Sequence, residues 1–261
     1  VISFQRRHNL KDDGVIRAET IKALNVPVEK RIRQMELNME RWRWLPLDLG
    51  KRYILVSITD FSLKIVRNDR VDMEMKVIVG KRIMNRRTIM HTPIFSAKMT
   101  HLEINPYWNV PHSIASKELL PLIKRDPSYL SRKNMMMFSG RGKVDPTTVD
   151  WTTMHEKNFR YQIRQNPGAF NALSHIKFLF PNRFDVYLHD TPTRNLFNRM
   201  PRDFSHGCMR VEKPIDMAVY LLNDPNTWSR ERILAVIKKG RNNPVYLPET
   251  ITVHVQYWTS W

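Results

Sequence analysis

The single cysteine of the 261-residue chain, Cys208, stands in the sequence Ser205-His206-Gly207-Cys208. A cysteine thiolate is a strong nucleophile once a nearby base has removed its proton. A glycine beside the thiol lets backbone N–H groups approach a bound oxygen closely. These four residues therefore predict a tight turn, rich in N–H donors, that presents a reactive thiol.

A candidate base, His189, ends a stretch in which apolar and polar residues alternate with the period of a half-buried strand. On one side of this strand stand Phe184, Val186 and Leu188, and on the other Asp185, Tyr187 and His189. Tyr187 and His189 should then point the same way. Asp190-Thr191-Pro192 break the strand, and a short fold-back beyond them would bring His189 to Cys208 as the base of a nucleophilic pair.

The cysteine has a second interpretation, because free cysteines are among the most buried residues and often only pack. One cysteine also excludes an intramolecular disulfide. The polar neighbours of Cys208 and the positive charge of Arg210 favour an exposed site in which the thiolate is stabilised. Another alternative is a catalytic zinc held by His189, His206 and Cys208, although the sequence offers no fourth ligand or glutamate base for it.

The pattern formed by His189 and the run Ser205-His206-Gly207-Cys208-Met209-Arg210-Val211 resembles the signature of L,D-transpeptidases with the YkuD-type catalytic domain. A long insertion from about Asn105 to Pro181 and the N-terminal FQRRHNLKDDGVIRAETIKALN are similar to the large periplasmic YcbB-like members. The resemblance covers nearly the whole chain. It implies a cofactor-free and metal-free enzyme of the periplasm or cell envelope of a Gram-negative bacterium.

The resemblance also implies a reaction. The Cys208 thiolate would attack the carbonyl that joins an L-centre to D-alanine in a tetrapeptide stem of peptidoglycan, with His189 as base and backbone N–H groups of Gly207 and Cys208 holding the oxyanion. An amine acceptor would resolve the thioester and give a 3→3 cross-link in cell-wall remodelling. Carbapenems would inhibit by acylating Cys208. The alternative is a non-catalytic peptidoglycan-binding protein that kept the fold.

Five residues are expected to bind substrate or shape its pocket. Tyr187 faces the same way as His189, and Arg210 could hold a substrate carboxylate or anchor the loop. His206 could orient the site or be structural, and Ser205 stands in the same turn. Trp108, at the start of the insertion, could line the substrate path.

Strand-like runs predict a mostly β catalytic domain over residues 51–261, and the resemblance implies a YkuD-type mixed β-sandwich, so that the whole chain is α+β. The runs cover residues 52–59, 62–68, 71–80, 92–104, 175–180, 184–190 and 251–258. The insertion at about 105–181 breaks them with helices and loops, and the family implies that it is a capping subdomain. Two packing helices are expected after Lys213, the second starting at Ser229 and ending at Gly240.

The N-terminal residues 1–26 predict a short helix, a turn at Asp13-Gly14 and a second helix from Ala18. They resemble the C-terminal part of a helical peptidoglycan-binding domain, or they form a hairpin that only packs. Residues 27–50 predict a connector helix between Pro27 and Pro46 whose apolar stripe belongs to the core. The chain starts within a domain pattern and stops within a strand-like run, which suggests a trimmed protein.

The formal net charge of +18 calls for an acidic partner or an acidic environment. The basic residues are scattered and form no nucleic-acid-binding module, so a polyanionic cell wall, or merely a solvated surface, is favoured over nucleic acid. The sequence contains no run of about 18 apolar residues, the length that a transmembrane helix requires.

Overall fold

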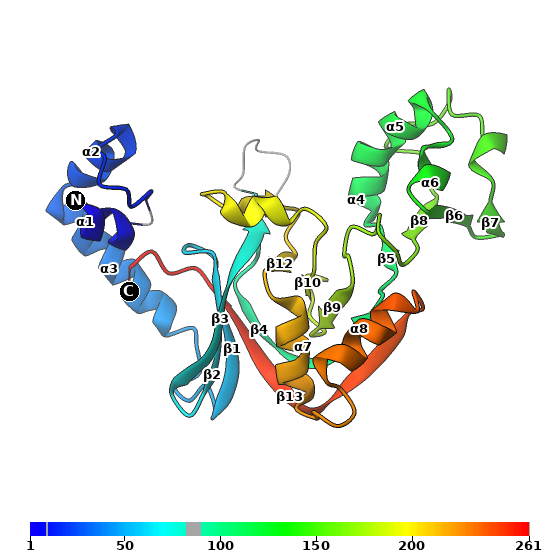
Figure 1. Cartoon of the computed structure of the whole chain (residues 1–261). Coiled ribbons are helices and arrows are strands. Elements are labelled where there is room, and N and C mark those ends of the chain that lie inside the picture. The colour runs from blue at the N-terminus through cyan, green and yellow to red at the C-terminus, as the bar shows by residue number, and fades with distance from the viewer. Residues whose placement is uncertain (9, 82–89, 261) are drawn as a thin grey trace.

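The computed structural model describes residues 1–8, 10–81 and 90–260. Its centre is a nine-stranded mixed sheet in the order β11-β3-β12-β10-β9-β4-β13-β1-β2, and β2 also pairs with β3, so the sheet closes on itself (Figure 1). The strands are β1 (Arg52–Ser57), β2 (Ser62–Arg67), β3 (Arg70–Gly80), β4 (Phe95–Ile104), β9 (Ile176–Leu179), β10 (Leu188–His189), β11 (Asp203–Ser205), β12 (Met209–Val211) and β13 (Asn243–Gln256). The mainly β prediction is confirmed.

The core of this sheet follows from the alternation in the sequence. Ile54 and Val56 of β1 are fully buried, and so are Leu63 and Ile65 of β2. Helices α7 (Pro214–Leu222) and α8 (Arg230–Lys238) supply further members of the same core. Burying side chains of this size stabilises the fold by roughly 1.5–3 kcal/mol each before entropy is subtracted. The predicted cap of α8 is confirmed, because Ser229 Oγ accepts the Arg232 N–H at 3.3 Å.

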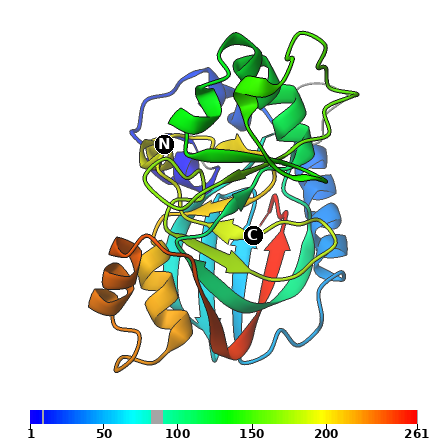
Figure 2. The same cartoon turned by 90° about the vertical axis from the view of Figure 1, so that its right-hand side faces the viewer.

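The insertion between β4 and β9 forms a separate lobe beside the large sheet (Figure 2). Its helical elements are α4 (His112–Ile114), the π-helical turn Ala115–Leu119, α5 (Leu120–Arg125), α6 (Tyr129–Arg132) and the 3₁₀ turn Pro146–Thr148. Its sheet has the order β5 (Trp108–Asn109), β8 (Gln162–Gln165), β6 (Met135–Ser139), β7 (Gly142–Val144). A second hydrophobic core includes Ile123, Leu130 and Met137. The expectation of helices and loops alone was therefore wrong, because these strands are too short for a clear alternation.

The N-terminal helices are α1 (Ile2–Arg7), α2 (Ala18–Leu24) and α3 (Val28–Trp42), with Gly14 in a left-handed turn before α2. The predicted core stripe of α3 was wrong, since Val28 and Met39 are 64% and 69% exposed. Instead, α3 attaches to the end of β13 through a polar residue. Asn38 is buried, donates to Thr259 Oγ1 at 2.9 Å and accepts the Thr259 N–H at 2.7 Å.

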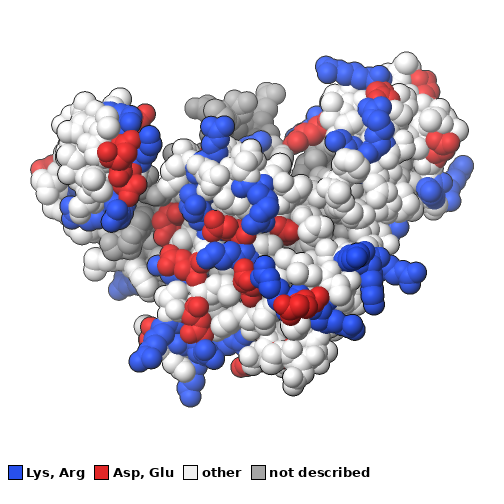
Figure 3. Space-filling model, viewed as in Figure 1, with Lys and Arg blue, Asp and Glu red and all other residues white. Residues whose placement is uncertain are grey.

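The surface charge is spread over the molecule. On the face shown in Figure 3, lysine and arginine side chains occur on the N-terminal helices, around the large sheet and on the inserted lobe, with acidic side chains among them. Among the residues that the structure describes, no helix has the length and hydropathy needed to cross a membrane.

Candidate active site

The parallel pairing of β10 with β12 places the predicted residues on one face of the large sheet. Leu188 lies opposite Met209 in the register, and both side chains are fully buried in the core. Because side chains alternate along a strand, the neighbours Tyr187, His189, Cys208 and Arg210 point to the other face. The Tyr187 and His189 rings lie 5.7 Å apart between centroids. The register pairs His189 with Arg210, and Cys208 stands two positions before Arg210, so the imidazole and the thiol lie on the same face in diagonally neighbouring positions.

The strand that carries His189 is shorter than expected. Only Leu188 and His189 pair with neighbouring strands, because Asp185 adopts a left-handed backbone conformation with φ of 52°. Asn182 holds this bend, since its Oδ1 accepts the Phe184 N–H at 3.0 Å and its Nδ2 donates to Val186 O at 2.7 Å. The predicted strand over 184–190 is therefore mostly a loop, and the Asp185 carbonyl lies 3.9 Å from Cys208 Sγ.

The Ser205 side chain stabilises the turn before Cys208. Ser205 Oγ accepts the Gly207 N–H at 3.2 Å and donates to the Cys208 carbonyl, and the residue is buried. The prediction that Ser205 contacts substrate is therefore corrected: its hydroxyl is used within the turn. The Gly207 N–H is therefore already used in its hydrogen bond to Ser205 Oγ. Within the described chain the Cys208 N–H makes no hydrogen bond, which makes it the better placed of the two predicted oxyanion donors.

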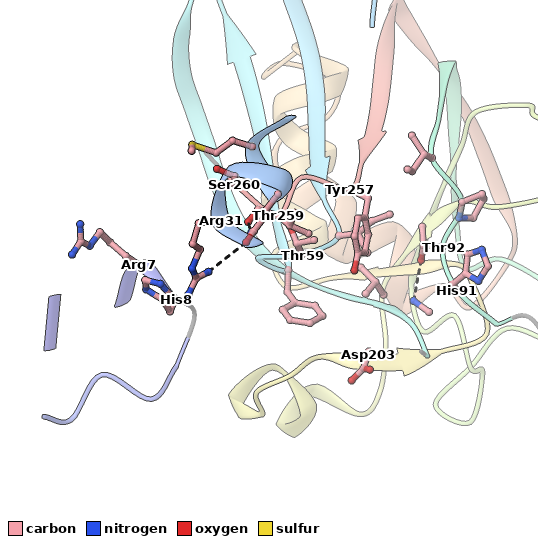
Figure 4. A pocket seen from close by; sticks show the side chains of 18 of the residues that line it. Arg7, His8, Arg31, Thr59, His91, Thr92, Asp203, Tyr257, Thr259 and Ser260 are labelled. Atoms are coloured by element: carbon pink, nitrogen blue, oxygen red, sulfur yellow. Dashed lines mark hydrogen bonds between the residues drawn. The ribbon is translucent and has the colours of Figure 1, made fainter. Parts of the chain in front are cut away.

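Thr92 also holds this turn, and no sequence pattern marks it for that role. Its buried hydroxyl donates to the Gly207 carbonyl at 2.8 Å and accepts the Gly80 N–H at 2.9 Å. Figure 4 shows Thr92 with a hydrogen bond drawn at its side chain. A Cβ on Gly80 would lie 2.1 Å from Met90 O and 2.6 Å from Thr92 N, so only glycine allows this close approach. Thr92 thus ties the end of β3 to the turn that carries the thiol.

Replacing Thr92 by valine should slow acylation of Cys208 by about tenfold and destabilise the fold by about 1–3 kcal/mol, because the Gly207 carbonyl and the Gly80 N–H lose a buried partner. Serine keeps the hydroxyl and should restore the acylation rate. The measurements are the acylation rate and the thermal midpoint of each variant. A valine variant with the parent's acylation rate would contradict the role given to Thr92.

His189 is a neutral base with a fixed tautomer. Its Nδ1 lies 2.5 Å from the carbonyl of Asp190, which can only accept, so Nδ1 carries the proton and Nε2 keeps its lone pair. Burial, and then the nearby charge of Arg210, lowers the pKa of His189 to about 3. Asp190 orders the following loop, since its buried carboxylate accepts the Thr191 N–H at 2.7 Å and an N–H of Arg194 at 3.2 Å.

The Cys208 thiol is protonated at rest. Burial raises its pKa, and hydrogen bonds from Tyr187 and the charge of Lys177 partly oppose this effect. Burial also raises the pKa of Tyr187 well above its usual range, so the phenol keeps its proton and can donate to the sulfur. A thiol with a raised pKa beside a neutral imidazole needs proton transfer to that imidazole during attack.

These pKa directions predict a flat pH profile. His189 loses its function as base only when protonated, and its folded-state pKa is about 3. We therefore expect the acylation rate to stay level between about pH 5 and pH 8, with no inflection near 6.5, the ordinary imidazole pKa. The rate should fall only as the pH drops towards 3. Single-turnover acylation at each pH measures this, and loss of half the rate between pH 6 and 7 would contradict it.

The inserted lobe reaches the site at two points. The Trp108 side chain hydrogen-bonds with Tyr187, which in turn contacts Cys208. His206 Nε2 lies 2.6 Å from Glu118 Oε1, so this histidine joins the thiol-bearing turn to the lobe. Lys177, which the sequence analysis did not select, lies on β9 beside His189 with its Nζ 4.5 Å from the centre of the Tyr187 ring.

Arg210 was predicted to hold a substrate carboxylate or to anchor its loop. Arg210 donates to Thr193 Oγ1 at 3.1 Å, while its buried Nε has no partner among the described residues. Part of the guanidinium is therefore still able to hydrogen-bond a ligand.

Nowhere in the part of the chain that the structure describes do three or more histidine, cysteine or acidic side chains form a group that could hold a metal. The zinc alternative is not supported, because His206 is directed to Glu118.

The site combines a half-buried thiol, a neutral imidazole and a Cys208 N–H without a partner in the described chain, which are groups that covalent acyl transfer uses. Residues 51–245 match the YkuD family, described as the L,D-transpeptidase catalytic domain. The match covers well over half of the chain, and the chain belongs to this family.

The chain is 33% identical over 259 residues to a Haemophilus influenzae protein whose assignment as an L,D-transpeptidase is itself provisional. The alignment covers 97% of this chain and 51% of that protein, so the chain spans about half the length of this relative. A solved L,D-transpeptidase from Xylanimonas cellulosilytica aligns over 98% of this chain and 78% of its own, with 14% identity and a TM-score of 0.34. Another, in complex with imipenem, aligns over 79% and 59%, with 14% identity and a TM-score of 0.33. The family assignment rests on the family match.

Proposed function

We propose that the chain is a peptidoglycan L,D-transpeptidase with Cys208 as nucleophile and His189 as base. The observation that carries this proposal is the shared face of β10 and β12, which holds the single thiol and a neutral imidazole whose Nε2 has no partner among the described residues. The same observation speaks against the non-catalytic alternative, since a binding protein has no need of a buried base with a fixed tautomer.

The first half of the reaction is an acyl transfer to sulfur. As His189 Nε2 takes the thiol proton, Cys208 Sγ attacks the carbonyl carbon that joins an L-centre to the terminal D-alanine. The Sγ–C bond forms, and the Cys208 N–H stabilises the negative oxygen. The C–N bond then breaks, and D-alanine leaves with the proton from His189.

The second half transfers the acyl group to an amine. The nitrogen of a neighbouring stem attacks the thioester, the C–S bond breaks and the thiol regains a proton through His189. The product is a 3→3 cross-link. We further propose that the lobe caps the cleft, that residues 1–26 belong to a peptidoglycan-binding domain and that the protein works in the periplasm. The bonds from the lobe through Trp108 and Glu118 support the first of these roles.

The experiment is product analysis with a defined donor tetrapeptide, by liquid chromatography and mass spectrometry. The parent should release D-alanine and form a cross-linked dimer, whereas Cys208→Ala should do neither. A chelator should leave the parent's rate unchanged. Release of D-alanine at the parent rate by Cys208→Ala, or its loss on chelation, would rule out the proposed mechanism.

A further inference from the structure

A cavity of about 800 Å³ lies between the N-terminal helices and the end of the large sheet. Helices α1 and α3 form one wall, the ends of β1, β3 and β13 form another, and the segment from His91 to Ile94 also lines the cavity. Figure 4 shows this elongated arrangement, with Arg7 and His8 at one end and His91 and Thr92 at the other. None of the residues used so far as catalytic groups lines it.

The end formed by the N-terminal helices is cationic. Arg31 donates to the Ala23 carbonyl at 3.0 Å and to Gln34 Oε1 at 3.4 Å, so its guanidinium is held in place by neutral groups. Neither Arg7 nor Arg31 has a carboxylate partner among the described residues. Asp203 is the one acidic residue in the described lining. An anionic group, above all a carboxylate, is the complementary ligand.

Apolar side chains make up much of the rest of the lining. Ile58, Phe61 and Ile94 are among them, and the Tyr257 ring adds an aromatic surface. A ligand with carboxylates at one end and small apolar side chains along its length fits this distribution, and a short peptide has that character. The site is also held firmly, because Asn38 of α3 is bonded twice to Thr259, another lining residue.

The far end of the cavity meets the thiol-bearing turn. Thr92 lines the cavity and donates to the Gly207 carbonyl at 2.8 Å. A Cβ on Gly207 would lie 3.8 Å from the His91 carbonyl, which shows how closely the two segments approach. The cavity therefore runs from Arg31 to the segment that packs against the turn carrying Cys208.

We infer that this cavity binds the acceptor peptide, with Arg7 and Arg31 holding its carboxylates and its amine directed towards the acylated Cys208. The inference rests on the proposed function and adds to it a role for the N-terminal helices: they contribute to acceptor binding as well as linking the domains. The bound amine attacks the thioester carbon, the C–N bond forms, the C–S bond breaks and the released proton returns to the thiol through His189.

The test is a direct binding measurement on the full chain carrying Cys208→Ala, titrated with a peptidoglycan stem tripeptide that has a free side-chain amine. Adding Arg31→Gln or Arg7→Gln should weaken binding by about tenfold each, the value of one charge-assisted hydrogen bond. The matched control is Arg33→Gln, on the same helix but outside the cavity and paired with Glu36. It should bind as the parent does, and all variants should melt at similar temperatures.

Equal binding by the Arg31 and Arg33 variants would overturn the inference. So would a peptide-free glycan chain that binds as tightly as the peptide and depends on the same arginines. Because the binding assay needs no thiol, it is separate from the proposed function. Peptide binding that depends on Arg31, together with a parent that is never acylated, would refute the transpeptidase mechanism while leaving the binding site in place.

Discussion

Replacing His189 by glutamine should slow acylation of Cys208 by about 10²–10⁴-fold, the usual contribution of a general base. Glutamine can still donate to the Asp190 carbonyl, so the local fold is kept. Its amide cannot take a proton, however, and the Cys208 thiol has a raised pKa, so little thiolate forms without the imidazole. The rate is measured by mass spectrometry of the acylated protein over time, after adding a carbapenem or a donor tetrapeptide.

The matched control is His101→Gln. His101 lies on β4 of the same sheet, packs against the Tyr246 ring and hydrogen-bonds with Thr100, and β4 is separated from the strand after Cys208 by β9 and β10. This variant should acylate as fast as the parent. A His189→Gln protein that melts like the parent and is acylated within threefold of its rate would exclude His189 as the base.

The second large effect is expected at Gly207, whose φ is 120°. An added Cβ would meet the His91 carbonyl at 3.8 Å, an ordinary contact, so space is not what requires glycine here. The backbone conformation requires glycine here, because residues with a side chain rarely adopt it. We expect Gly207→Ala to relax the turn, displace the Cys208 N–H and lose the bond from Thr92. Acylation should fall by at least about 10²-fold, the typical cost of losing one oxyanion donor.

Gly142→Ala separates this effect from general strain. Gly142 has a φ of 111° in the hairpin between β6 and β7, with no atom within 4 Å of an added Cβ. Both variants should lose stability by about 1–3 kcal/mol, but only Gly207→Ala should lose acylation. If the two variants kept the parent's acylation rate, the turn geometry would not matter for the chemistry.

The sequence predicted what depends on neighbouring residues. Helix α2 begins at Ala18 and helix α8 at the Ser229 cap, as expected. The common direction of Tyr187 and His189 followed from strand alternation alone. Each of these features is local, so its signal lies within a few residues.

What the sequence could not show depends on contacts between distant segments. Thr92 precedes Gly207 by more than a hundred residues, and Glu118 meets His206 only because the lobe folds back over the turn. Neither residue carries a local pattern that marks it. The prediction for α3 failed for a related reason. The amphipathic pattern is real, but its residues remain largely exposed even where Trp42 stacks on Trp258, and the buried residue of α3 is Asn38.

The most direct test of the account is intact-protein mass spectrometry after incubation with a carbapenem, on the parent and on Cys208→Ala. We expect one adduct on the parent, assigned to Cys208 by peptide mapping, and none on the variant. A folded, metal-free parent that forms no adduct, or an adduct of equal yield on Cys208→Ala, would contradict the assignment of Cys208 as the acylated nucleophile.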